Sequence, residues 1–262
     1  MGKIKNIYVN GCSFSCSGGM HWNDVRTYYK NILNIDITDD NVNDYGYANI
    51  IANKFNLKLI NESIPGGSTN RLIRKTYEYI YNYPNELGET IFILELPPGW
   101  RDEFYSNVLD RTINITGGLI YSPNTDLTEI ANGHSPNDVK KFYNEFMNYF
   151  NNFLNLSFEE TKTCNNLVGM LSFIKSKNLK YILIDGIGFE KFLKNKNTSI
   201  DEYNFCKFEN QFLMHRWFEK RKLTISDELG VQIDGHAGIL GNEKISEIVI
   251  KYINEIYPKI LI

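Results

Sequence analysis

"IYVNGCSFSCSGG" (residues 7–19) joins an apolar run to a loop of small polar side chains, and this junction defines the first strand of the chain. Starting slightly earlier, "IKNIYVN" (4–10) predicts a buried strand that ends at Gly11. So much Gly, Ser and Cys after a strand fits a tight turn, a phosphate-binding loop, a thiol site or a nucleophilic serine. Other parts of the sequence decide among these four.

Length and composition place the chain among ordinary globular proteins. Its 262 residues are enough for one large α/β domain or two small ones, with a sizeable core. A hydrophobic share of 42% and a charged share of 23% are typical of soluble domains. The net charge of −3 provides no bulk attraction for nucleic acid, so we expect no nucleic-acid partner.

Neither a secretory signal nor a membrane-spanning segment is predicted. The apolar run in "MGKIKNIYVNG" (1–11) is too short for a signal, and no stretch reaches the roughly 20 apolar residues of a spanning helix. We therefore expect a cytoplasmic location and no membrane partner. The four cysteines include no CxxC pair, which disfavours a zinc ribbon or a thioredoxin motif and favours free thiols. They are Cys12, Cys16, Cys164 and Cys206.

Hydrophobic periodicity predicts strands that alternate with helices. The predicted strands cover residues 4–10, 57–63, 90–96, 180–187 and 231–234. The predicted helices cover residues 45–56, 71–83, 135–156, 158–178 and 242–257. Thr69 or Asn70 is the expected N-cap of the second helix, and Ser135 that of the third. Residues 100–135 carry turn signals and predict an irregular excursion.

This alternation predicts an α/β fold, a three-layer α/β/α sandwich with a mostly parallel central sheet in one domain. Ligands bind to such sheets outside the carboxyl ends of the strands. The chemistry is therefore expected in five loops that follow predicted strands. These loops are residues 11–19, 64–70, 97–104, 185–188 and 234–238.

Three side chains in these loops have the types needed for nucleophilic catalysis. A serine hydroxyl attacks only when a base takes its proton, and an imidazole does so best when a carboxylate fixes its tautomer. Ser13 lies in the first loop, and Asp234 and His236 lie together in the last. In the second loop, Gly66 and Gly67 allow a close approach of backbone to a ligand.

Three segments resemble the SGNH (GDSL-type) hydrolases. "NGCSFS" (10–15) is similar to the first block, "YGYANIIANKFNLKLINESIPGGSTNRLIR" (45–74) to the approach and the second block, and "DGHAGILGNEKISEIV" (234–249) to the last block. The resemblance implies an SGNH-like, flavodoxin-like domain over residues 1–262, with a family-atypical insertion at roughly 100–230 around the fourth strand. It assigns the nucleophile to Ser13, the base to His236, and an oxyanion-binding N–H to Gly67, with Gly66 next.

Two departures from the family pattern concern the site. The third block lacks its usual asparagine, since "LELPPGWRDEF" (94–104) stands there. Asn70 or Arg101 is the expected substitute, unless backbone donors act alone; a missing oxyanion donor costs about a hundredfold in rate. Asp234 lies two residues before His236 where the family has three, so a Ser-His dyad is the alternative to a triad.

Each candidate also has a structural interpretation. Ser13 can cap a helix that begins with Ser15, Cys16 and Ser17. Cys12 fits a small buried residue. Gly66 and Gly67 can make only a turn, Asn70 can cap the next helix, Arg101 can anchor a loop, and Asp185 can be a turn residue. The remaining histidines are expected to be ordinary surface or core residues. They are His21, His134 and His215.

The resemblance implies a serine esterase that acts on small acyl esters, with O-acetyl groups on carbohydrate as the first choice. Its partner would be a small-molecule or glycan ester, without metal or cofactor. The alternative is an SGNH-fold protein with a degraded site that binds carbohydrate or has a structural role. A nucleotide-binding domain is disfavoured, because "GCSFSCSGG" (11–19) matches neither the Walker pattern nor GxGxxG.

Overall fold

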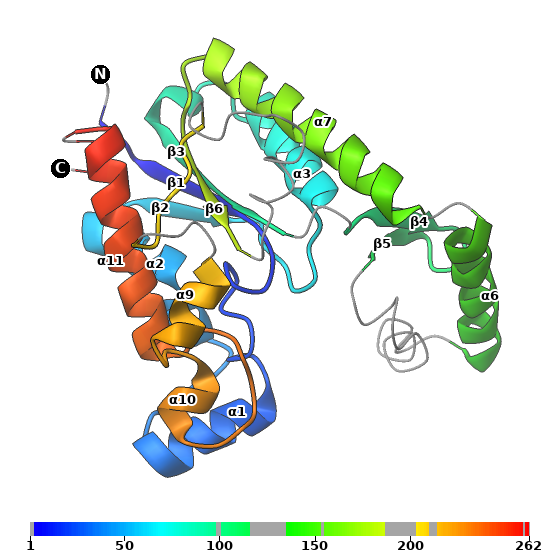
Figure 1. The fold of residues 1–262 in the computed structure, drawn as a ribbon, viewed down its shortest axis with the longest axis horizontal. Helices are drawn as coiled ribbons and strands as arrows, with labels where there is room; N and C mark the ends of the chain where they lie inside the picture. Colours follow the sequence, from blue (N-terminus) through cyan, green and yellow to red (C-terminus); the bar gives the residue numbers. More distant parts are fainter. Residues whose placement is uncertain are drawn as a thin grey trace.

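A parallel sheet of four strands forms the centre of the chain (Figure 1). The computed structural model describes residues 3–97, 101–115, 135–152, 155–186, 203–209, 214–258 and 260–261. The strands are β1 (Asn6–Asn10), β2 (Lys58–Asn61), β3 (Thr90–Leu96) and β6 (Lys180–Asp185). Their order is β2-β1-β3-β6, and all three pairings are parallel. The predicted α/β fold with a parallel sheet is confirmed.

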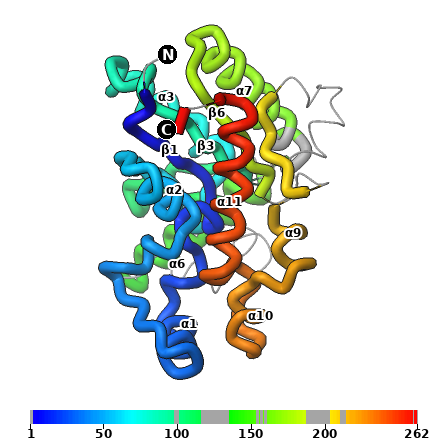
Figure 2. The backbone as a smooth tube through the Cα atoms, turned by 90° about the vertical axis from the view of Figure 1, so that its left-hand side faces the viewer, coloured from blue at the N-terminus to red at the C-terminus, as the bar shows by residue number. Residues whose placement is uncertain are grey.

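Helices cover both faces of this sheet, because its inner strands are apolar on both sides. Ile7, Val9 and Ile93 point to one face, where they pack against α2 (Tyr47–Phe55), α9 (Met214–Lys220) and α11 (Ile239–Ile256). Tyr8 and Phe92 point to the other face. There they pack against α3 (Thr69–Asn82) and α7 (Leu156–Ser176). Figures 1 and 2 show these layers and the neighbouring chain termini.

The predicted helices form with small changes at their ends. α3 has Ser68 as its N-cap, not Thr69 or Asn70, because the Ser68 hydroxyl accepts the Arg71 N–H. Ser135 accepts the Asp138 N–H at the start of α6 (Pro136–Asn152), as expected. α11 begins at Ile239, three residues before the predicted start, where Glu228 accepts the N–H groups of its first two residues.

Two predicted elements do not form. Residues 231–234 are irregular, because the Ser226 hydroxyl accepts the N–H groups of Ile233 and Asp234 that a strand would need. Residues 13–21 form successive turns, and the first helix, α1 (Asn23–Tyr28), starts well after Ser17. The short helix α10 (Ile225–Leu229) completes the segment before His236.

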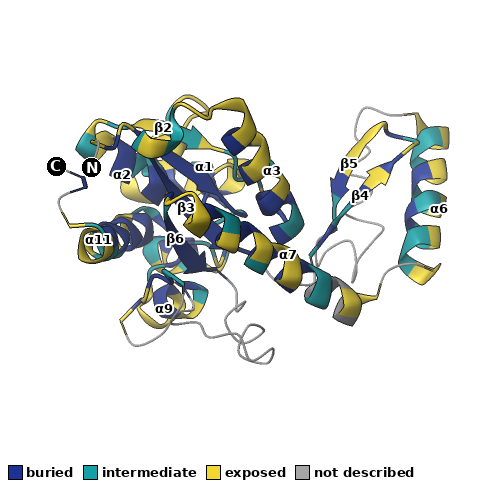
Figure 3. Cartoon of the chain, turned by 90° about the horizontal axis from the view of Figure 1, so that it is seen from above, coloured by how far each residue is buried: buried dark blue, intermediate teal, exposed yellow. Residues whose placement is uncertain are grey.

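A hairpin lies away from the main sheet (Figures 1 and 3). Its strands are β4 (Glu103–Ser106) and β5 (Arg111–Asn114), which pair antiparallel within the segment expected to be irregular. Phe104 of this hairpin packs with Phe142 and Phe146 of α6 in a separate apolar cluster. Residues 116–134, which include His134, lie outside the described residues. None of the helices in the described residues is apolar over enough length to cross a membrane.

Replacing Ser226 by Ala should lower the free energy of unfolding by about 1–2 kcal/mol, because two backbone N–H groups lose their acceptor. Urea denaturation measures this change. Ser172→Ala is the matched control, since the Ser172 hydroxyl donates only to the Val168 carbonyl within an exposed part of α7. Equal stability of the two variants would contradict the assigned role of Ser226.

Candidate active site

Ser13, His236 and Asp234 form one hydrogen-bonded chain. Nε2 of His236 lies 2.8 Å from Oγ of Ser13, and Nδ1 lies 2.7 Å from Oδ1 of Asp234. Ser13 follows β1, whereas the other two residues lie between α10 and α11. The Asp234 side chain is only 5% exposed, that of His236 is 21% exposed, and Ser13 is half-buried, so the carboxylate is at the buried end of the chain. This is the arrangement in which an imidazole can take a serine proton.

The short spacing between Asp234 and His236 does not prevent their contact. Oδ1 of Asp234 accepts a hydrogen bond from the backbone N–H of His236 at 3.1 Å, and this bond closes a tight turn. The same oxygen contacts Nδ1 of the His236 ring. Ser226 holds the Asp234 backbone from α10, and the His236 carbonyl accepts the Ile225 N–H. The carboxylate therefore reaches Nδ1 from two residues away.

Two adjacent glycines make room for the ends of this chain. A Cβ at Gly18 would lie 2.6 Å from Cβ of Ser13, and the Gly18 N–H donates to the Ser13 carbonyl at 2.6 Å. Gly19 has a φ of +84°, and a Cβ there would lie 1.8 Å from Oδ2 of Asp234. The pair "GG" in the opening loop is thus required by a close approach to both Ser13 and Asp234.

We expect Gly19→Ala to displace Asp234, because the new methyl group has no space and the left-handed backbone adds strain. Any Ser13-dependent ester hydrolysis should fall by at least about tenfold, given what small misplacements of catalytic groups cost. Steady-state kinetics measures the fall. Gly230→Ala is the matched control, since Gly230 has a φ of +69° with nothing near its Cβ position. A smaller loss of activity in Gly19→Ala than in the control would contradict the steric role.

Glu95, at the end of β3, is a buried carboxylate beneath the serine loop that sequence reasoning did not single out. Its side chain is fully buried, and its oxygens accept the Cys12 N–H at 2.9 Å and the Cys12 thiol at 3.0 Å. Cβ atoms at Gly11 and Gly186 would lie 2.5 Å and 2.3 Å from these oxygens. Glu95 therefore fixes the turn that follows β1. In the sequence, the only sign of this role is a charged residue within an otherwise apolar strand.

The thiols beside Ser13 are held in their protonated form. Burial raises the pKa of Cys12 well above its ordinary value, and the nearby Glu95 carboxylate raises it further. Burial raises the pKa of Cys16 to about 12. A thiolate is the reactive form of cysteine, so these environments do not support a cysteine nucleophile. All four cysteines lie within the described residues, where they are buried and form no disulfide.

Glu95→Leu should lower the free energy of unfolding by about 1–3 kcal/mol, because the buried Cys12 N–H loses its acceptor. Glu95→Gln should lose less, since its carbonyl oxygen can still accept this N–H. Chemical denaturation of both variants measures the difference. If leucine proved as stabilising as glutamine, Glu95 would not hold the turn as described.

The two glycines of the second loop form a turn. Gly67 donates its N–H to the Ile64 carbonyl at 3.1 Å, and Gly66 has a φ of +70° after Pro65, as in a type II turn. The oxyanion role expected for the Gly67 N–H is therefore not supported. Gly67 is instead required by packing, since a Cβ there would lie 2.7 Å from the Gly11 carbonyl oxygen.

Available backbone donors are the N–H groups of Ser13 and Gly66, which have no hydrogen-bond acceptor among the described residues. The N–H of Ser13 lies next to its own hydroxyl by covalent geometry. It is therefore the donor best placed for the carbonyl oxygen of an acyl group that is bonded to Oγ, where the oxyanion forms.

Asn70 does not supply the missing amide. Its Nδ2 donates to Asp102 at 2.7 Å and to Thr163 at 3.2 Å, so both amide hydrogens are used between α3 and α7. Arg101 is half-buried, and its charge lowers the pKa of Cys12 against the larger effects of burial and Glu95. It remains a candidate donor near the site. Asp185 is a fully buried residue at the end of β6, and the turn role expected for it is not observed.

Aromatic rings surround His236. Phe14 lies between His236 and His215, with ring centroids 5.0 Å and 5.5 Å away. Trp22 meets His236 edge-on at 6.2 Å and is 53% exposed. Burial lowers the pKa of His215, Glu219 opposes the shift, and His236 adds to it. Two residues expected to be ordinary therefore border the site, His215 here and His21 through its contact with the Cys16 carbonyl.

The lowered pKa of His215 predicts a pH-dependent stability. Unfolded His215 takes up a proton near its ordinary pKa of about 6.5, whereas the folded residue resists protonation, so the free energy of unfolding falls as the pH decreases through this range. His215→Gln should make that fall shallower. Denaturation between about pH 7.5 and pH 5.5 tests it, and an unchanged slope in the variant would contradict it.

Comparison with known proteins finds similarity in structure only. A scan against family models and a search of curated proteins by sequence both returned no match. The psychrotrophic esterase EstA from Pseudoalteromonas sp. aligns at 14% identity over 96% of this chain and 97% of its own, with a TM-score of 0.44. TesA aligns at 10% identity over 98% and 100%, with a TM-score of 0.40.

LAE5, an α/β hydrolase from the metagenome of Lake Arreo, Spain, aligns at 11% identity over 97% of both chains, with a TM-score of 0.34. The chemistry of this chain has to be read from its own side chains.

Proposed function

We propose that the chain is a serine ester hydrolase with Ser13 as nucleophile, His236 as base and Asp234 as its orienting carboxylate. The observation that carries the proposal is the unbroken hydrogen-bonded chain from Ser13 Oγ through the imidazole to Asp234. A buried carboxylate at Nδ1 leaves Nε2 free to accept the serine proton. The protonated thiols nearby leave the serine as the group that attacks.

The reaction follows from this geometry. Oγ of Ser13 bonds to the acyl carbon while its proton passes to Nε2 of His236, and the carbonyl electrons move onto the oxygen. The Ser13 N–H stabilises that oxyanion. Cleavage of the C–O bond expels the alcohol, which takes the proton from His236 and leaves an acyl group on Ser13. Water then attacks with His236 again as base, which releases the acid and restores the serine.

A small acyl group is the proposed substrate, with O-acetyl esters of carbohydrate as the first choice. This choice rests on the resemblance of the three sequence segments to SGNH hydrolases. Trp22, which is exposed beside His236, supports it, because an open aromatic side chain can pack against a sugar ring of the alcohol part.

A non-catalytic role is the second candidate. It is favoured because two expected oxyanion donors already have other acceptors. The Gly67 N–H closes a turn, and the Asn70 amide binds Asp102 and Thr163. A site with a proton relay but a weak oxyanion hole would bind esters without turning them over at a useful rate.

Hydrolysis of p-nitrophenyl acetate separates the two candidates. The wild-type protein should turn over, and Ser13→Ala should reduce kcat/KM to the background rate, a loss of at least about ten-thousandfold for a residue that forms the covalent bond. Asp234→Asn should lose about a hundredfold or more with little change in KM, because it acts through the imidazole tautomer. Ser172→Ala serves as the surface control. Equal activity of wild type and Ser13→Ala would favour the non-catalytic role.

A further inference from the structure

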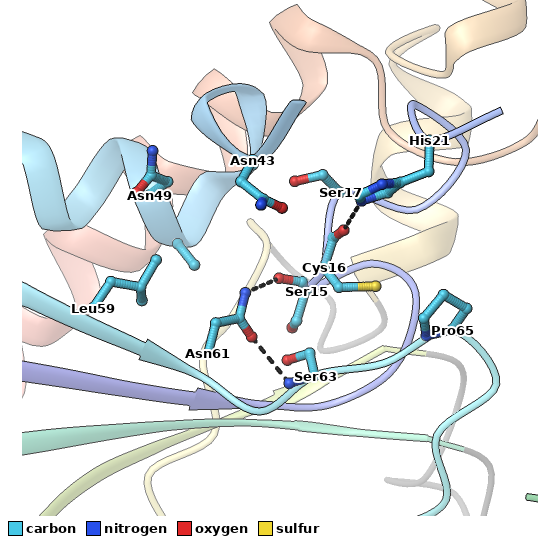
Figure 4. A pocket seen from close by; sticks show the side chains of 12 residues that line it. Ser15, Cys16, Ser17, His21, Asn43, Asn49, Leu59, Asn61, Ser63 and Pro65 are labelled. Atoms are coloured by element: carbon cyan, nitrogen blue, oxygen red, sulfur yellow. Dashed lines mark hydrogen bonds between the residues drawn. The ribbon is translucent and has the colours of Figure 1, made fainter. Parts of the chain in front are cut away.

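A cavity of about 720 Å³ lies beside the serine loop and is separate from the Ser13–His236–Asp234 chain, none of which lines it (Figure 4). Its walls come from residues 15–17 of the loop, the first turn of α2, β2 and the segment that follows β2. The volume falls within the range of about 300–1,000 Å³ typical of small-molecule sites. Nothing in the reaction proposed above uses it.

The lining of this cavity is uncharged and combines polar with apolar groups. Six of the twelve described residues that form it have hydroxyl or amide side chains, and none of the twelve is Asp, Glu, Lys or Arg. His21 bonds through Nε2 to the Cys16 carbonyl at 3.0 Å, which makes Nε2 the donor and leaves Nδ1 as an acceptor. Leu59 and Pro65 add apolar surface.

Two hydroxyl groups in the cavity have no partner among the described residues. Ser17 is 4% exposed, and its hydroxyl points toward Asn43 in Figure 4. The Ser63 hydroxyl is buried without a hydrogen-bond partner. Buried hydroxyls without partners are uncommon, because each loses its bonds to water. A ligand at this wall would supply the bond that the buried Ser63 hydroxyl lacks, and the unpartnered Ser17 hydroxyl lines the same cavity.

The backbone is shaped to present the Ser17 hydroxyl. Ser17 has a φ of +58°, a conformation that disfavours side chains other than glycine by about 1 kcal/mol or more. A Cβ at Gly46, at the start of α2, would lie 2.2 Å from the Ser17 hydroxyl oxygen, so a glycine leaves room for it. The turn itself does not require a serine at position 17, because glycine adopts a positive φ without this strain.

We infer that this cavity binds a neutral, hydroxyl-rich ligand, a carbohydrate in chemical terms. Ser17, Ser63 and Asn43 supply donors and acceptors without charge, and Leu59 and Pro65 supply an apolar wall for the CH groups of a sugar ring. The start of α2 could also attract an anion. A phosphate ligand is disfavoured, because no cationic side chain among the lining residues balances its charge and Asp44 lies beside the cavity, bonded to Asn49.

The ligand would contact the loop that carries Ser13. The thiol of Cys16 donates to the Ser13 carbonyl at 3.6 Å, and Gly18 donates to the same oxygen, so residues 16–18 are tied to the serine. The inference nevertheless goes beyond the proposed function. Binding at Ser17 and Ser63 holds whether or not Ser13 reacts.

Isothermal titration of Ser13→Ala protein tests the site without interference from turnover. Glucose, N-acetylglucosamine and cellobiose are the neutral probes, and glucuronate and inorganic phosphate are the charged ones. At least one neutral sugar should bind saturably and more tightly than both charged probes. Adding Ser17→Gly, which suits the positive φ, together with Ser63→Ala should weaken Kd about tenfold or more, as expected from losing two hydrogen bonds.

Ser172→Ala in the same background is the matched control and should leave Kd unchanged. If the double variant fails to fold, Ser63→Ala alone should still weaken Kd by about threefold. The absence of saturable binding by every neutral probe, tighter binding of phosphate or glucuronate, or unchanged affinity in a folded Ser17→Gly/Ser63→Ala protein would each overturn the inference. Loss of ester hydrolysis in Ser13→Ala bears only on the proposed function, so the two can fail independently.

Discussion

The hydrogen bonds between the Glu95 carboxylate and Cys12 fix the point at which the chain leaves β1, and the rest of the site depends on that point. Parallel strands β1 and β3 end side by side, and the flanking connections cross to opposite faces of the sheet there, so a crevice opens between them. A buried carboxylate fills the base of that crevice. Glycines at positions 11 and 186 are the consequence, since any side chain would meet its oxygens.

Contacts between distant segments then bring Ser13, His236 and Asp234 together. Ser13 and His236 are 223 positions apart, yet they are in hydrogen-bond contact. Gly18 makes room for Ser13, and Gly19 makes room for Asp234. From the other side, α10 holds the Asp234 backbone through Ser226 and caps α11 through Glu228. The position of the imidazole is therefore determined by packing against two loops and two helix ends, and Phe14 limits its rotation.

The elements that local physics governs were predictable from the sequence. Buried strands and amphipathic helices appear as periodic apolar residues. Ser13, Asp234 and His236 were singled out by residue type and by loops after predicted strands, although the strand expected at 231–234 does not form. The contact between Asp234 and His236 was not predictable, because their two-residue spacing was equally compatible with a Ser-His dyad. Nothing in the sequence indicated the turn in which the His236 N–H donates to Asp234.

Features that depend on tertiary contacts were not predictable. Residues 231–234 have the pattern of a strand, but a hydroxyl on α10 takes their N–H groups. Asn70 has the right chemistry for an oxyanion hole, but a carboxylate brought near by the chain after β3 occupies its amide. The hydrogen bond that Glu95 accepts could not be predicted from "TIFILEL" (90–96), because its donor, the Cys12 N–H, follows a different strand.

Labelling with a fluorophosphonate followed by peptide mapping tests the central claim that Ser13 is an activated nucleophile. The account predicts a single phosphonyl adduct on the Oγ of Ser13, and loss of labelling when His236 is replaced by alanine, because the imidazole takes the serine proton. An adduct on another side chain, or labelling that persists undiminished in Ser13→Ala protein, would contradict it.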